Sequence, residues 1–461
     1  MPTPRVSSQT LVEECVQWAK TRISEQVYRV GMRMPSIRKF ARQRGVSPFT
    51  VVDAYERLVA TGYLEARRGS GFYVCRLAPI IRRRHAEERT QIDLRWLTRH
   101  MLESASARGP GLGVLPGAWL ESTELTTALR SIARQRTERL FNDATQLGFP
   151  PLRSVVQYRL ARLDIVTNPE QVLLTTGVTH ALNLVLQTFV RPGETVLIPE
   201  PFWFGAHGML ATFGVNVIGV PCTPDGIDLA ALERLVDTHR PRLLILSSAA
   251  HNPLGISLSA VAAARIFKLV EQRGVLIFED DVYADLCTTA VTRLAAADRL
   301  RHVIYAGSFS KTLSSNVRVG FVACSPERAQ ALADTKILSG FTTPQLNERL
   351  VHKLLVEGQY DKHVAGLRRR LALHRRRSAT LLQSHGVESF GAGNDGMFFW
   401  INMRTDTNEL AMRWRDKGLL LAPGSLFLHR QAASEWMRFN VTTQIDRPLI
   451  ELLAGVHGRP A

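Results

Sequence analysis

The sequence predicts two folded parts, a small α+β domain followed by a large α/β domain with a mostly parallel sheet. The chain has 461 residues, more than one hydrophobic core usually supports. Helix-capping residues and a hairpin pattern occur within its first 75 residues, and short β-branched segments alternate with helical patterns from Gln171 onward. We therefore expect domains over residues 1–75 and 115–461, joined by a basic connector over residues 76–114.

The overall composition is typical of a soluble folded protein, with 45% apolar and 21% charged residues. No segment approaches the roughly 18 consecutive apolar residues of a membrane-spanning helix, and residues 1–10 lack the pattern of a signal peptide. We therefore expect a cytoplasmic protein with no membrane partner. The five cysteines are widely separated and form no Cys-x-x-Cys pair, which argues against a disulfide framework and against a metal site.

The positive charge is concentrated near the N-terminus. Residues 1–90 contain 17 Lys and Arg against 8 Asp and Glu, so they hold +9 of the formal net charge of +17. A concentrated basic domain is typical of DNA-binding proteins, because cationic side chains displace the counterions of the phosphates. A solvated basic surface is the alternative, and charge alone does not decide between the two.

The first two helices are predicted from apolar spacing and from capping residues. Apolar residues recur with a helical period within residues 10–30. Ser36 stands where it can cap a short helix that ends at Arg44. Gly45 follows at the position where a helix end favours a residue with positive φ.

A third helix and a hairpin follow at once. Ser47 is a candidate cap, Pro48 suits the first helical position, and the helix is expected to continue to Gly62. The short turn between the second and third helices is the spacing of a helix-turn-helix. Beyond it, residues 63–67 and 72–75 are β-prone segments joined by a glycine-rich turn, a pattern that predicts a hairpin.

This order of helices and hairpin resembles the winged-helix domain of GntR-type regulators. The residues that carry the resemblance are Pro35-Ser36-Ile37-Arg38, Gly45-Val46-Ser47, Thr50-Val51, Ala54-Tyr55, Gly62-Tyr63-Leu64 and Gly69-Ser70-Gly71. The resemblance implies that the start of the third helix enters the major groove of DNA. The candidate DNA-binding residues are Ser36, Arg38, Ser47, Phe49, Thr50, Gly69 and Ser70. Family members commonly carry a polar or basic residue where this chain has Pro48-Phe49, which leaves base recognition open.

The connector is rich in arginine and lacks periodicity, with four consecutive basic residues or histidines at 82–85. Such a segment is typical of a solvated tether. Nonspecific contacts with DNA phosphates are the alternative. Glycines and prolines over residues 109–117 are expected to mark the start of the large domain.

The large domain should place its chemistry at the carboxyl ends of its strands. The expected strands are residues 172–176, 195–199, 215–220, 243–247, 275–279 and 302–305. In parallel sheets of this kind, ligands bind beyond the carboxyl ends of the strands. The first strand leads through Gly177 directly into a helix, which predicts an anion site at the N-terminus of that helix.

Polar and aromatic residues follow one strand after another. The segments are Glu200-Pro201-Phe202-Trp203, His251-Asn252-Pro253-Leu254-Gly255, Asp280-Asp281-Val282-Tyr283 and Ser308-Phe309-Ser310-Lys311, with Arg318 seven residues later. Only 8 of the 58 basic residues are lysines, so Lys311 stands out. A lysine amine, unlike arginine, can form a Schiff base with an aldehyde cofactor.

These segments resemble the fold-type-I pyridoxal phosphate enzymes of the aminotransferase superfamily, over residues 115–461. The resemblance implies that Lys311 forms the Schiff base with pyridoxal 5′-phosphate and that Asp280 keeps the pyridine nitrogen protonated. It also implies that Tyr283 and Asn252 hydrogen-bond the phenolic oxygen of the cofactor and that Trp203 stacks on its ring.

The same resemblance supplies a phosphate site and a carboxylate site. The implied phosphate ligands are Gly177, Val178, Thr179, Ser308 and Arg318. Arg438 matches the arginine that binds a substrate carboxylate in these enzymes, and a surface salt bridge is the alternative role for it.

Two departures from the family pattern favour cofactor binding without turnover. Relatives commonly carry a Tyr-x-x-Pro-x-Gly segment that reaches the partner's phosphate site. Residues 142–148 read Asn-Asp-Ala-Thr-Gln-Leu-Gly and lack that tyrosine and proline. Asp395 also stands in a glycine-rich turn before residues 397–400.

A GntR-type domain joined to an aminotransferase-like domain resembles the MocR subfamily of transcription regulators. The resemblance implies a homodimer that binds double-stranded operator DNA and senses an amine, an amino acid or the cofactor itself through Lys311. Two alternatives remain open, a catalytic aminotransferase with an appended DNA-binding module and a DNA-binding protein that has lost its cofactor. The sequence identifies neither the effector nor the operator, and it does not separate activation from repression.

Overall fold

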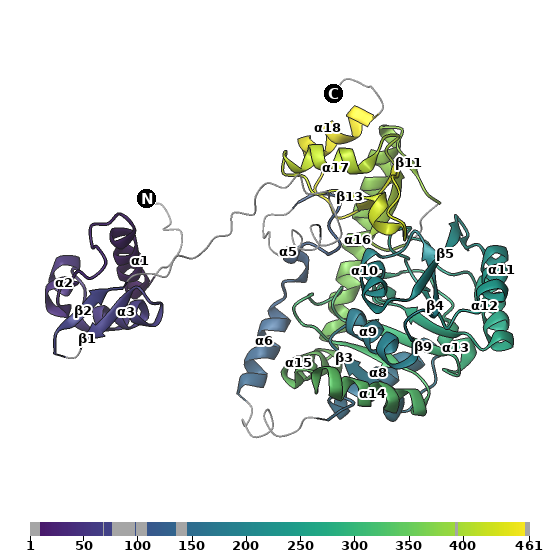
Figure 1. Cartoon of the computed structure of the whole chain (residues 1–461), viewed down its shortest axis with the longest axis horizontal. Helices are drawn as coiled ribbons and strands as arrows, with labels where there is room; N and C mark the ends of the chain where they lie inside the picture. Colours follow the sequence, from purple (N-terminus) through teal and green to yellow (C-terminus); the bar gives the residue numbers. More distant parts are fainter. Residues whose placement is uncertain are drawn as a thin grey trace. The chain divides into compact units, whose positions relative to one another are not determined.

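The computed structural model describes residues 10–67, 69–75, 97, 108–134, 145–391 and 395–456. The chain divides into two compact units, residues 1–89 and 90–461, which are described separately (Figure 1). Most of the predicted connector, including its basic cluster at 82–85, lies outside the described residues, as do residues 142–144. Among the residues that are described, no helix is both long and apolar enough to cross a membrane.

The small unit consists of three helices and a two-stranded hairpin. Its elements are α1 (Leu11–Ser24), α2 (Ile37–Arg44), α3 (Pro48–Ala60), β1 (Leu64–Arg67) and β2 (Gly71–Val74). The order is the predicted one. The first helix ends earlier than its apolar pattern does, and Gln26 just beyond it has a positive φ of 59°.

The capping residues act as the sequence predicts. The Ser36 hydroxyl accepts a hydrogen bond from the Lys39 amide (3.3 Å), and the Ser47 hydroxyl accepts one from the Thr50 amide (3.1 Å). Gly45 ends α2 with a φ of 67°. The turn between α2 and α3 is therefore fixed by local bonds.

A small aromatic core holds the hairpin against the helices. Tyr55 is fully buried, and its ring contacts those of Phe40 and Phe72 edge to face. Its hydroxyl donates a hydrogen bond to the carbonyl of Pro35 (2.9 Å). The core therefore positions the N-terminus of α3 and the hairpin on one rigid body.

The large unit contains an eight-stranded sheet in the order β3-β10-β9-β8-β7-β4-β5-β6. The strands are β3 (Val172–Thr175), β4 (Thr195–Glu200), β5 (Asn216–Thr223), β6 (Gly226–Ile227), β7 (Leu243–Leu246), β8 (Leu276–Asp280), β9 (Val303–Ser308) and β10 (Gly320–Ala323). The central strands from β9 to β5 are parallel, whereas β10 is antiparallel to both its neighbours and β6 is antiparallel to β5. The six predicted strands are all present, and the sheet is mostly parallel as expected.

Helices cover both faces of this sheet. Successive side chains of a strand point to opposite faces, and along β7 Leu243 and Ile245 pack on one face while Leu244 and Leu246 pack on the other. The helices against the first face are α9 (Val178–Phe189), α10 (Phe204–Phe213) and α14 (Pro326–Gly340). Those against the second are α6 (Thr123–Ala133), α8 (Pro150–Ala161), α11 (Leu229–His239), α12 (Ala260–Arg273), α13 (Leu294–Asp298) and α15 (Gln345–Val356).

The C-terminal part adds a second sheet that the sequence analysis did not identify. After the long helix α16 (Gln359–Ser384) come β11 (Glu388–Ser389), β12 (Phe398–Asn402), α17 (Thr407–Arg415), β13 (Ala422–Pro423), β14 (Trp436–Asn440) and α18 (Arg447–Val456). The antiparallel order is β11-β12-β14-β13. This part lies at one end of the large unit, yellow in Figure 1, and its strand β14 carries Arg438.

Candidate cofactor pocket and DNA-binding surface

One pocket at the carboxyl ends of the strands is lined by all ten residues that the sequence analysis selected for the cofactor. Its lining consists of Gly177, Val178, Thr179, Trp203, Ser247, Asn252, Asp280, Val282, Tyr283, Ser308, Ser310, Lys311, Ser315 and Arg318. Four of these, namely Ser247, Val282, Ser310 and Ser315, were not selected. Three of the four directly adjoin a selected residue or end a predicted strand, which is the pattern that would have identified them.

One side of the pocket is built for an anion. Helix α9 begins at Val178, so its first backbone amides have no partners within the helix. Gly177, which precedes the helix, has a φ of 103°, and a Cβ there would lie 3.4 Å from the Arg318 guanidinium. Gly320 permits the close approach of the neighbouring backbone, since a Cβ on it would lie 2.6 Å from the Gly177 Cα. Arg318 forms no ion pair among the described residues, so its charge is available to an anion.

Lys311 and Asp280 provide the reactive amine and a buried carboxyl group. Burial, together with the positive charge of Arg438, lowers the pKa of Lys311 to about 8. Burial raises the pKa of Asp280 to about 7, against the hydrogen bond that its carboxylate accepts from the Val282 amide (3.1 Å). A lysine with such a pKa has an appreciable fraction of neutral, nucleophilic amine near neutral pH.

A chain of polar groups leads from the pocket to Arg438. The Asn252 side-chain amide donates to the Tyr283 hydroxyl (3.4 Å), and the Arg438 guanidinium donates to the Asn252 carbonyl oxygen (3.1 Å). The Lys311 Nζ atom lies 5.7 Å from the centre of the Tyr283 ring. Arg438 does not line the pocket itself, but Asn252 connects it to the lining.

Arg438 is a buried cation without a carboxylate partner among the described residues. It is 1% exposed, and its guanidinium carbon lies 4.6–5.4 Å from the ring centres of Phe204, Phe398 and Phe427. Its Nε atom has no hydrogen-bond partner in the part of the chain that the structure describes. Burial lowers the pKa of Arg438 to about 10. An uncompensated buried charge is costly, so this position is suited to a carboxylate supplied by a ligand. The alternative role, a surface salt bridge, is excluded by this burial.

Residues 109–114, which we call the strap, pass directly over these cations. The Gly113 carbonyl accepts a hydrogen bond from Lys311 Nζ (2.7 Å), and the Gly111 carbonyl accepts one from an Arg438 Nη atom (2.7 Å). The sequence analysis placed only the start of the large domain here. Nothing local in this glycine-rich segment indicates contacts with residues roughly 200 and 330 positions away.

Trp203 stands at the N-terminus of α10 with its ring folded back over Gly205. A Cβ at Gly205 would lie 2.2 Å from the Trp203 ring, so a glycine is required there. The sequence analysis selected the tryptophan but not the glycine that shapes its position.

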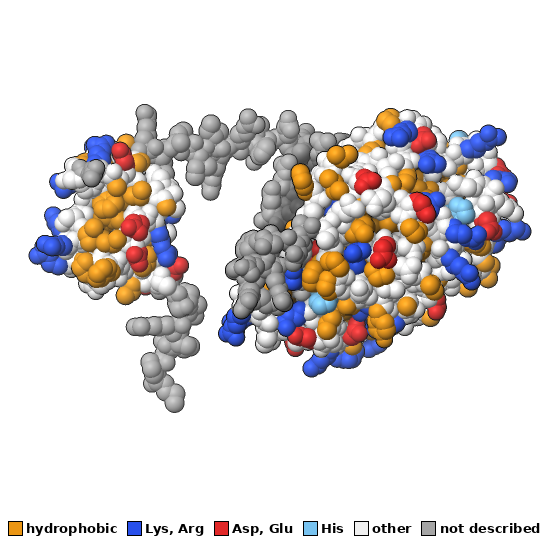
Figure 2. All heavy atoms as spheres, turned by 90° about the horizontal axis from the view of Figure 1, so that it is seen from below, with side chains coloured by type: hydrophobic (Ala, Val, Ile, Leu, Met, Phe, Trp, Pro, Cys, Tyr) orange, Lys and Arg blue, Asp and Glu red, His pale blue; other side chains and the backbone are white. Residues whose placement is uncertain are grey.

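The selected DNA-binding residues gather at the helix-turn-helix and at the hairpin of the small unit. Phe49 is 83% exposed in the first turn of α3, and Arg38 is exposed on α2. Ser36 and Ser47 are caps, Thr50 is half-buried, Gly69 is exposed, and the Ser70 hydroxyl bonds the Tyr73 hydroxyl at 2.6 Å. On the face seen in Figure 2, the Lys and Arg side chains of the large unit are scattered among acidic and apolar ones.

Asp395 has a structural role in this chain. Its carboxylate accepts hydrogen bonds from the backbone amides and the hydroxyls of Thr288 and Thr289, at 2.5–3.1 Å. It does not line the cofactor pocket. The tyrosine that relatives carry near residue 142 concerns positions outside the described residues, except for Thr145 to Gly148.

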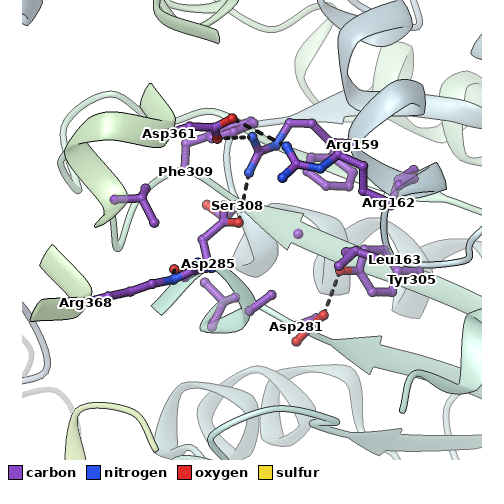
Figure 3. A pocket seen from close by; sticks show the side chains of 16 residues that line it. Arg159, Arg162, Leu163, Asp281, Asp285, Tyr305, Ser308, Phe309, Asp361 and Arg368 are labelled. Atoms are coloured by element: carbon purple, nitrogen blue, oxygen red, sulfur yellow. Dashed lines mark hydrogen bonds and ion pairs between the residues drawn. The ribbon is translucent and has the colours of Figure 1, made fainter. Parts of the chain in front are cut away.

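A second pocket, of about 240 Å³, lies between α8, α16 and the ends of β8 and β9 (Figure 3). Arg159 bonds Asp285 (2.9 Å) and Asp361 (2.8 Å), and both Arg293 and Tyr305 donate to one carboxylate oxygen of Asp281 (2.7 Å each). The other Asp281 oxygen has no partner among the described residues. The cations Arg159 and Arg293 at this pocket are therefore already neutralised by carboxylates.

The residues of the first pocket fit pyridoxal 5′-phosphate. A helix N-terminus and an unpaired arginine suit its phosphate, a neutralisable lysine suits its aldehyde, and a buried carboxyl group suits its pyridine nitrogen. Within the described ranges, no group of three or more His, Cys, Asp and Glu side chains could hold a metal ion.

Comparisons with known proteins agree with this geometry. Residues 123–455 match the family model "Aminotransferase class I and II", and residues 11–74 match "Bacterial regulatory proteins, gntR family". The HTH-type transcriptional regulator YdcR of Escherichia coli is 28% identical over 94% of this chain and 95% of its own. The probable rhizopine catabolism regulatory protein MocR of Rhizobium meliloti is 27% identical over 77% and 73%.

Among solved structures, one similar chain is LysN, the α-aminoadipate aminotransferase of Thermus thermophilus, complexed with N-(5′-phosphopyridoxyl)-L-leucine. It superposes with a TM-score of 0.71 at 28% identity, covering 78% of this chain and 93% of that one. The similarity lies in the large unit's fold and leaves the N-terminal unit to the regulators.

Proposed function

Because this chain belongs to the aminotransferase class I and II family and is a GntR-type transcription regulator of the MocR subfamily, we propose that its pyridoxal phosphate pocket senses a small carboxylate-bearing amine. When bound, the cofactor supplies an aldehyde that condenses reversibly with primary amines. Sensing, in this proposal, consists of an amine reaching that aldehyde while its carboxylate binds Arg438.

Each residue has a separate task in this proposal. Lys311 holds the cofactor through its amine, and Asp280 holds the proton of the pyridine nitrogen. The N-terminus of α9 and Arg318 bind the phosphate, while Tyr283 and Asn252 orient the ring oxygen.

The observation that carries the proposal is the state of Arg438. It is buried among three aromatic rings, has an unpartnered Nε atom, and is connected through Asn252 to the cofactor pocket. A carboxylate would form two parallel, charge-assisted bonds with such a guanidinium. An amine that lacks a carboxylate leaves the guanidinium unpaired, so we expect amino acids to be sensed better than simple amines.

The proposal includes DNA, a second copy of the chain and a compartment. The exposed start of α3 and the hairpin would contact double-stranded operator DNA, with Arg38 on a phosphate. A homodimer would present two such domains to two half-sites. Since an operator lies in the bacterial cytoplasm, the proposal also locates the protein there.

A catalytic aminotransferase is the second candidate, because the lysine, the carboxyl group and the tyrosine of the pocket are all in place. It predicts steady-state formation of product from an amino donor and a 2-oxo acid. A regulator predicts at most slow conversion and a change in DNA binding instead.

The test is a gel shift with promoter DNA over a range of salt concentrations, performed with protein that shows the visible absorption of bound pyridoxal phosphate. We expect a specific complex whose affinity falls as salt rises. The Arg38→Ala variant should weaken binding to all sequences and reduce the salt slope by about one. Absence of any complex at every salt concentration would contradict the proposal, and multiple turnovers without DNA binding would favour the enzyme. Absence of the visible absorption would favour a protein without cofactor.

A further inference from the structure

The strap forms six hydrogen bonds to the rest of the large unit, and these divide into two kinds. Four involve groups that no ligand needs. Asn440 uses its backbone amide to bond the Pro110 carbonyl (2.9 Å) and its side-chain amide to bond the Leu112 and Val114 carbonyls (2.9 and 3.0 Å), and Leu420 accepts from the Gly111 amide (2.9 Å). The other two come from Lys311 and Arg438.

The strap fits against its neighbours closely enough that its glycines are required. A Cβ on Gly111 would lie 2.4 Å from the backbone of Leu421, and one on Gly109 would lie 2.5 Å from the Leu420 carbonyl oxygen. A Cβ on Gly113 would lie 3.3 Å from the Arg438 guanidinium. The backbone therefore approaches both the second sheet and the buried cation directly.

We propose that the strap is an internal competitor of the ligand, docked on Lys311 and Arg438 when the site is empty and released when cofactor and carboxylate occupy them. This inference rests on the proposed function. In sequence, the strap follows directly on the residues that lead to the DNA-binding unit, so its release is a direct route from ligand binding to DNA binding.

The competition follows from the chemistry of the two donors. Condensation of the Lys311 amine with the cofactor aldehyde releases water and leaves the nitrogen with at most one hydrogen, which weakens its bond to the Gly113 carbonyl. A ligand carboxylate carries a full negative charge and two acceptor oxygens, whereas the Gly111 carbonyl carries only a partial charge. The carboxylate is therefore the stronger partner for Arg438 and displaces the Gly111 carbonyl from it.

Two probes that differ only in a carboxylate separate the two contributions. N-(5′-phosphopyridoxyl)-L-leucine carries the cofactor and a carboxylate, and N-(5′-phosphopyridoxyl)-3-methylbutylamine carries the cofactor alone. Each is added to the cofactor-free full-length chain, and hydrogen exchange is followed by mass spectrometry in the peptide that covers residues 109–116. Binding of each probe is verified by competition with pyridoxal phosphate.

We expect the Gly111 amide, which is bonded to Leu420, to exchange roughly tenfold faster with the leucine probe than with the amine probe. In Arg438→Met the difference between the probes should vanish, while the exposed Arg430→Met control should retain it. Equal or slower exchange with a bound leucine probe overturns the strap proposal alone. Failure of both probes to compete with pyridoxal phosphate overturns the proposed function on which it rests.

Discussion

The two pockets at the ends of β8 and β9 differ in how their charged groups are paired. Asp280 and Asp281 are consecutive, yet the first lines the cofactor pocket and the second lines the pocket in Figure 3. In the second pocket, Arg293 and Arg159 are neutralised by carboxylates of the protein. In the cofactor region, Arg438 has only carbonyl oxygens as partners among the described residues.

The difference teaches that unpaired charge, rather than pocket size, distinguishes the binding site. The pocket with paired charges is the larger, at about 240 Å³ against about 120 Å³. A buried cation without a carboxylate lowers the stability of the empty protein and increases the gain when an anionic ligand binds. Arg293 and Arg159 give stability, whereas Lys311 and Arg438 give affinity, and four predictions test this division.

The largest expected effect is that of Lys311→Ala. Because only this amine can bond the cofactor aldehyde in the pocket, the visible absorption of bound cofactor should be lost completely. Spectra recorded during titration with pyridoxal phosphate measure it. Lys268→Ala, at an exposed position on α12, serves as the control and should titrate like the unmodified protein. A normal spectrum in Lys311→Ala would show that another group holds the cofactor.

The next effect is on the free energy of unfolding without ligand. Arg293→Met leaves the buried carboxylate of Asp281 unpaired and should cost about 3–5 kcal/mol. Arg438→Met removes a buried charge that no carboxylate compensates, and this gain offsets part of two lost hydrogen bonds. It should stay within about 2 kcal/mol of the original protein. Urea unfolding followed by tryptophan fluorescence compares them, and equal losses would remove the distinction between the pockets.

Ligand affinity should respond in the opposite order. Losing a charge-assisted pair costs about 1.5–3 kcal/mol, so Arg438→Met should bind the leucine probe roughly 10- to 150-fold more weakly. Arg159→Gln removes two ion pairs of the second pocket and should leave this affinity unchanged. Isothermal titration measures both. A comparable loss in Arg159→Gln would mean that the second pocket contributes to binding.

The smallest expected effect is a pH dependence of cofactor capture. The neutral Lys311 amine is the reactive form, and its pKa is lowered to about 8. The rate of pyridoxal phosphate binding should rise with pH, by up to about tenfold per unit below pH 8, and level off above it. Stopped-flow absorbance gives the profile. A rate that keeps rising to pH 10 would mean that burial does not lower the pKa of this amine.

Much of this arrangement could be predicted because it depends on local patterns. Ser36, Gly45 and Ser47 occupy capping positions that any helix of this kind requires, and they cap as expected. The cofactor-site residues follow directly on predicted strands, so the parallel order of the sheet was enough to bring them together.

The features that the sequence did not reveal depend on distant contacts. The second sheet contains strands of only two residues, such as β11 and β13, which carry no detectable alternation. The strap shows only glycines and prolines, and its meaning comes from Lys311 and Arg438 far along the chain. The burial of Arg438 among aromatic rings likewise follows from tertiary packing.

The measurement that tests the central claim most directly is fluorescence anisotropy of labelled promoter DNA during titration of the pyridoxal phosphate-bound protein with amino acids. For the original protein, the account predicts that at least one amino acid changes the DNA affinity and that its decarboxylated amine does so far less. Arg438→Met should bind the same DNA without that response. An equal response to the amine, or an undiminished response in Arg438→Met, would contradict it.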